Sequence, residues 1–70
     1  MEDIWKAVLD YLNGKMSHAD YRVWINPIKP VSLSGHSIEV QVPNRFFEDW
    51  LTQNYASLIK EGLFHALGRE

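Results

Sequence analysis

A chain of 70 residues and 8.2 kDa has room for one small domain and no more. The sequence is 46% hydrophobic, which is enough for a folded core, and it has no cysteine, which excludes disulfides and thiolate metal sites and favours a reducing, cytoplasmic environment. The net charge of −2 and the scattered lysines and arginines argue against a domain that grips nucleic-acid phosphates strongly. No apolar run approaches the roughly 20 residues of a membrane span, so we expect no membrane association.

The first predicted element is a helix over residues 3–13, because its apolar residues recur with helical spacing. Val8 and Leu12 are predicted core residues of this helix. Trp5 and Leu9 lie at one edge of an apolar stripe that is wider than one core face needs. Trp5 therefore has two interpretations: an ordinary core tryptophan, or an exposed anchor for another protein.

A second, short helix is predicted from His18 to about Ile25. Ser17 and Asp20 have the form of a capping box, with a hydroxyl at the cap and a carboxylate three residues later. We expect this helix to bury Tyr21 and Trp24 and to stop before a proline two residues after its end.

The apolar period then changes from 3.6 to 2, which predicts a β-hairpin with one buried face and a turn at residues 34–37. The residues expected on that face are Val31, Leu33, Ile38, Val40 and Val42. A two-stranded sheet is marginal by itself, so a third strand beyond the last residue is plausible on physical grounds.

Asn44 is a good N-cap for a helix predicted over residues 45–53. The apolar pattern then changes phase, which indicates a break near Asn54, a further helix over residues 55–66 and a stop at Gly68. The core residues expected in these two helices are Phe47, Trp50, Leu51 and Leu58, together with Trp24 from the earlier helix. The order is thus α-α-β-β-α, a single α+β domain over residues 1–70 with helices packed on a short antiparallel sheet.

Phe46 and Phe47 are consecutive, so one helix cannot bury both along the same line. Phe47 shares its stripe with Leu51, which leaves Phe46 as the outward residue beside Arg45. An exposed aromatic residue next to a cation is a candidate contact patch for a partner protein.

No constellation in the sequence predicts catalysis, a metal or a cofactor. Ser17, His18 and Asp20 are the residue types of a hydrolase triad, but they lie on one turn and the cap explains two of them. The three histidines lack metal-ligand spacing, and the glycines are isolated, so no phosphate-binding loop is present.

Residues 42–51, with the sequence Val-Pro-Asn-Arg-Phe-Phe-Glu-Asp-Trp-Leu, resemble the signature of the N-terminal domain of the bacterial replication initiator family DnaA. Tyr55 and residues 58–59 continue the resemblance, and Trp5 and residues 21–27 match it upstream. The resemblance covers essentially the whole chain, in order and with matching spacing.

This resemblance implies a KH-like α/β domain of a bacterial, nucleoid-associated cytoplasmic initiator whose ATP-binding and DNA-binding domains lie elsewhere. It implies weak self-association, recruitment of the replicative helicase and docking of clade-specific regulators, with at most weak contact to single-stranded DNA. Trp5 then corresponds to the self-association tryptophan, with Leu9 as its neighbour. Asp20 and Phe46 correspond to helicase contacts, and Tyr21 and Arg45 lie beside them.

The alternative function is a KH-like domain that binds single-stranded nucleic acid. The sequence lacks the GxxG motif of that class and has no basic cluster, so both features favour protein binding.

Overall fold

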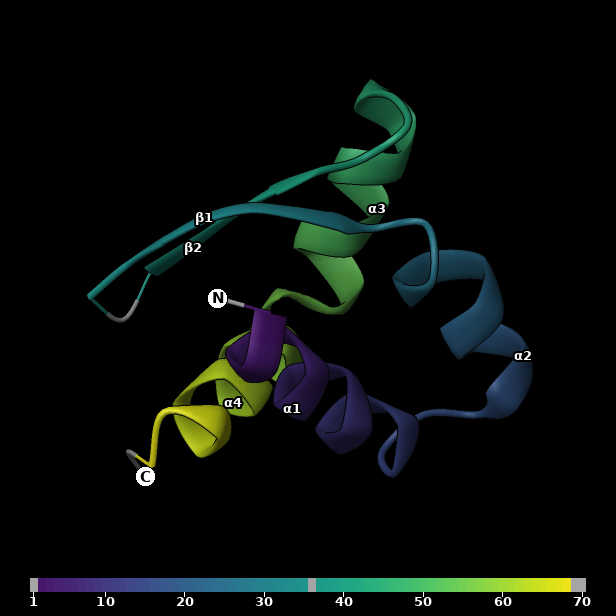
Figure 1. Cartoon of the computed structure of the whole chain (residues 1–70). Helices are drawn as coiled ribbons and strands as arrows, with labels where there is room; N and C mark the ends of the chain where they lie inside the picture. The colour runs from purple at the N-terminus through teal and green to yellow at the C-terminus, as the bar shows by residue number, and fades with distance from the viewer. Residues whose placement is uncertain (1, 36, 69–70) are drawn as a thin grey trace.

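The computed structural model describes residues 2–35 and 37–68, which form a group of helices with a two-stranded sheet along one side (Figure 1). This arrangement confirms the predicted small α+β fold. In chain order the elements are α1 (Glu2–Asn13), α2 (His18–Asp20), the π-helical turn η1 (Tyr21–Ile25), β1 (Lys29–Ser34), β2 (Ser37–Gln41), α3 (Arg45–Asn54) and α4 (Ala56–Ala66).

Helices α1 and α4 pack against each other and form the base of the domain (Figure 1). Gly62 of α4 permits this close crossing, because a Cβ atom there would lie 3.3 Å from the Val8 Cγ1 and the Tyr11 Cδ2 atoms. The core that continues from this contact comprises Trp5, Val8, Leu12, Ile25, Ile28, Phe47, Leu51 and Leu63. The core residues come from α1, η1, α3 and α4 and from Ile28 just after η1, and none comes from the hairpin, so the helices hold the domain together.

Two predicted helix caps are confirmed. The Ser17 Oγ accepts a hydrogen bond of 3.1 Å from the Asp20 backbone N–H, which starts α2. The Asn44 Oδ1 accepts one of 2.8 Å from the Phe47 backbone N–H, which starts α3. Each cap satisfies a backbone donor that has no partner within the helix, so short local sequence is enough to set both starting points.

The predicted break between the last two helices is also confirmed, one residue later than expected. Tyr55 has φ −128° and ψ 0°, which interrupts the helix between α3 and α4. Gly68 has a φ of +76°, a conformation that glycine adopts readily, and it follows the end of α4 as predicted.

The hairpin corrects one part of the sequence prediction. The strands pair in antiparallel fashion, but a bulge interrupts the register between Pro30 and Ser32. Val31 is the extra residue, and its side chain is exposed instead of lying on the buried face. The bulge moves the inward positions of β1 to Pro30 and Leu33, which are half-buried, because an inserted residue shifts the two-residue alternation.

The second helix has the predicted length but an unexpected form. After one α-helical turn the chain widens into η1, where the Asn26 N–H donates to the Tyr21 carbonyl oxygen at 3.0 Å. Tyr21 and Trp24, which we expected to be buried, are only half-buried, and Ile25 takes the fully buried position. The wider turn changes the angle between successive side chains, so a pattern based on 3.6 residues per turn misplaces them.

The close crossing of α1 and α4 gives a stability prediction. Gly62→Val adds methyl groups where even a Cβ is already tight against Val8 and Tyr11, so the free energy of unfolding should fall by about 1–3 kcal/mol. Urea denaturation measures this change. Ser57→Val, at an exposed position of the same helix, is the matched control, and an equal loss in both variants would contradict the packing explanation.

Candidate protein-interaction surface

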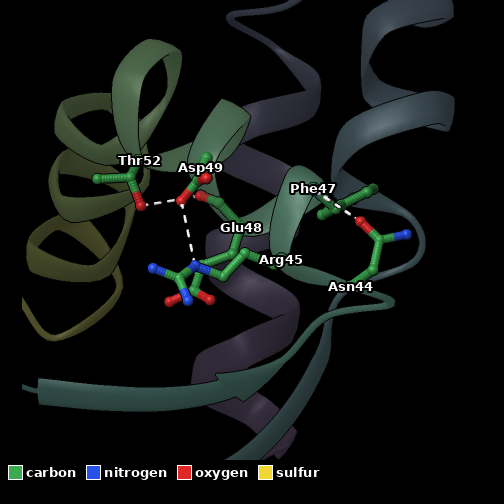
Figure 2. Close-up of polar contacts among 6 residues, drawn as sticks. All are labelled: Asn44, Arg45, Phe47, Glu48, Asp49 and Thr52. Atoms are coloured by element: carbon green, nitrogen blue, oxygen red, sulfur yellow. Dashed lines mark hydrogen bonds and ion pairs between the residues drawn. The ribbon is translucent and has the colours of Figure 1, made fainter.

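Helix α3 has one face in the core and one in solvent. Phe47 and Leu51 are buried, whereas the side chain of Phe46 is 71% exposed. The Asn44 cap sets this orientation, because it fixes where the helix begins and each residue then advances by about 100° (Figure 2). The prediction that Phe46 is the outward phenylalanine is confirmed.

The prediction that Trp50 is a core residue is wrong, because Trp50 is 40% exposed. It stacks on the half-buried Trp24, with ring centroids 5.1 Å apart and an angle of 20° between the planes. Trp24 in turn contacts the buried Phe47, at a centroid distance of 5.1 Å. Trp24 therefore lies between Phe47 and Trp50, and Trp50 covers it from outside.

Trp24, Phe46 and Trp50 together define what we call the aromatic surface. Phe46 and Trp50 are four residues apart on α3 and so lie on the same side of the helix. The contact between Trp24 and Trp50 joins this side to η1. Exposed aromatic side chains supported from below by core residues are typical of the central residues of protein interfaces.

Arg45 and Asp49 add charge beside Phe46. The Arg45 Nε and the Asp49 Oδ1 are 3.9 Å apart, and their side chains are 88% and 60% exposed (Figure 2). An ion pair this long and this exposed contributes little to folding, because water and salt screen it. Both charges are thus accessible to a partner.

Asp20 and Tyr21 lie on the neighbouring segment. Asp20 is exposed, and Tyr21 is half-buried, with its pKa raised above 10.0 by burial and by the charge of Asp10. The pKa of Tyr55 is also raised above 10.0, by burial, by the charge of Asp20 and by a hydrogen bond to the Asp20 carboxylate. Asp20 therefore lies against the junction between α3 and α4 in addition to its place in the capped turn.

Trp5 is buried, with 6% of its side chain exposed, and it packs in the core with Val8 and Leu12. The interpretation of Trp5 as an exposed anchor is wrong in this structure, and the core interpretation is right. Its neighbour Leu9 is half-buried and packs against the same core. The wide apolar stripe of α1 is explained by α4, which covers a second side of that helix.

The remaining predicted core residues divide into two groups. Val8, Leu12, Phe47 and Leu51 are buried as expected. The others that pack against the core are only half-buried: Trp24, Val40, Val42 and Leu58.

A groove of 570 Å³ lies between β2, α3 and α4, and sequence reasoning did not find it. Its inner wall is apolar, from Ile38, Val40, Val42, Leu51, Ile59 and Leu63. Glu48 and Thr52 line it from α3, and Ala56 and Lys60 line it from α4. No sequence pattern indicates this groove, because its apolar residues look like ordinary inward positions of three separate elements.

Within residues 2–35 and 37–68, no three acidic, histidine or cysteine side chains are grouped so that they could hold a metal ion. None of the helices that the structure describes has the length and apolar character to cross a membrane.

Comparison with known proteins identifies the family. The model of the DnaA N-terminal domain matches residues 2–64. The chain belongs to the DnaA N-terminal domain family. Relatives named chromosomal replication initiator protein DnaA are 34% identical over 97% of the chain in Flavobacterium psychrophilum and 32% identical over 99% in Chlorobaculum tepidum. A third, from Thermodesulfovibrio yellowstonii, is 30% identical over 96% of the chain.

The chain spans 14% of the length of the Flavobacterium and Chlorobaculum relatives. It is therefore similar to one domain of a DnaA replication initiator. The resemblance that residues 42–51 indicated is confirmed by these matches.

The burial of Trp5 and the exposure of Phe46 predict that their substitutions affect the stability of the fold very differently. Trp5→Ala should lower the free energy of unfolding by about 3–5 kcal/mol, because it leaves a cavity in the core. Phe46→Ala should change it by no more than about 0.5 kcal/mol, because that side chain is mostly in water. Chemical denaturation followed by circular dichroism measures both. Equal stabilities of the Trp5→Ala variant and the wild type would show that Trp5 is not a core residue.

The contact between Asp20 and Tyr55 predicts a pH effect. The folded-state pKa of Tyr55 lies above its ordinary value of 10.0, so the neutral phenol stabilises the fold, and stability should fall as the pH rises through 10. Asp20→Asn should lower the pKa of Tyr55, and NMR titration of its ring protons measures the change. Asp10→Asn is the control, because Asp10 acts on Tyr21 instead. A Tyr55 pKa that is unchanged in Asp20→Asn would contradict the assigned contact.

Proposed function

We propose that this chain is a non-enzymatic protein-interaction module of a bacterial replication initiator. In this proposal it binds the replicative helicase and clade-specific regulators, and it associates weakly with further copies of itself. The family membership supports the initiator context. The exposure of Phe46 beside the stacked pair of Trp24 and Trp50 carries the proposal, because it gives the domain an accessible aromatic surface.

The residues proposed to contact the helicase or a regulator come from two neighbouring segments. Phe46 and Arg45 lie on α3, Asp20 is the last residue of α2, and Tyr21 is the first residue of η1. The stacked tryptophans connect these segments, since Trp24 belongs to η1 and Trp50 to α3. An aromatic centre with charged residues at its edge matches the usual division of an interface into an apolar core and a polar rim.

The resemblance implies self-association through Trp5 and Leu9 on α1, and this assignment stays a proposal. Trp5 is enclosed by the core, so its removal would act through folding, and Leu9 offers only a half-buried side chain. A small contact between copies suits an initiator that must assemble reversibly, because interfaces below about 1,200 Å² are weak and several tethered copies strengthen them.

Binding of single-stranded nucleic acid is the second candidate. The aromatic surface favours it to some degree, because bases stack on exposed aromatic rings. The net charge of −2 and the acidic neighbours Asp20 and Asp49 oppose it, because a binding groove for a nucleic-acid backbone needs clustered positive charge.

Phe46→Ala should weaken binding to the replicative helicase at least about tenfold, because a central aromatic residue of an interface typically carries that much affinity. Isothermal titration calorimetry of the folded variants measures it. Val31→Ala is the matched control, since it removes another exposed apolar side chain, from the bulge of β1. Equal helicase affinities of the Phe46→Ala variant and the wild type would refute the proposed contact.

A titration with single-stranded DNA at two salt concentrations separates the two candidate functions. The protein-interaction function predicts weak binding with little dependence on salt. Micromolar binding that falls steeply with added salt would instead favour the nucleic-acid function.

A further inference from the structure

We draw no further inference here: the strongest candidate, the apolar groove between β2, α3 and α4, carries nothing because nothing in the structure shows what covers it.

Discussion

The hydrogen bond from the Phe47 N–H to the Asn44 side chain decides which way α3 faces. The cap sets the first residue of the helix, and because Phe47 and Leu51 on one side of it are buried, Phe46 points to solvent. Trp24 then packs on Phe47, and Trp50 stacks on Trp24. The aromatic surface is thus built outward from one capped helix start.

The same helix contributes to the groove on its other side. Leu51 belongs to the core and to the groove wall, and Glu48 borders the groove. A rotation of α3 about its axis would therefore disturb the core, the aromatic surface and the groove together. This coupling places the aromatic surface and the groove on two sides of one helix, with a single core beneath them.

Local features of the fold could be predicted from the sequence. The caps at Ser17 and Asn44, the break before α4 and the outward direction of Phe46 depend on neighbouring residues alone. Features that depend on contacts between segments far apart in the sequence could not be predicted. Trp5 is buried because α4 covers α1, Trp50 is exposed because it stacks on the outer side of Trp24, and Val31 is exposed because of a bulge in the pairing with β2.

The account depends most on the contrast between an enclosed Trp5 and an accessible Phe46. NMR with a soluble gadolinium chelate measures this contrast directly, because the chelate broadens the resonances of protons that it can approach. The structure predicts strong broadening of the Phe46 ring protons in the monomer and little broadening of the Trp5 indole protons. A broadened Trp5 together with a protected Phe46 would contradict the orientation of α3 and both surfaces that depend on it.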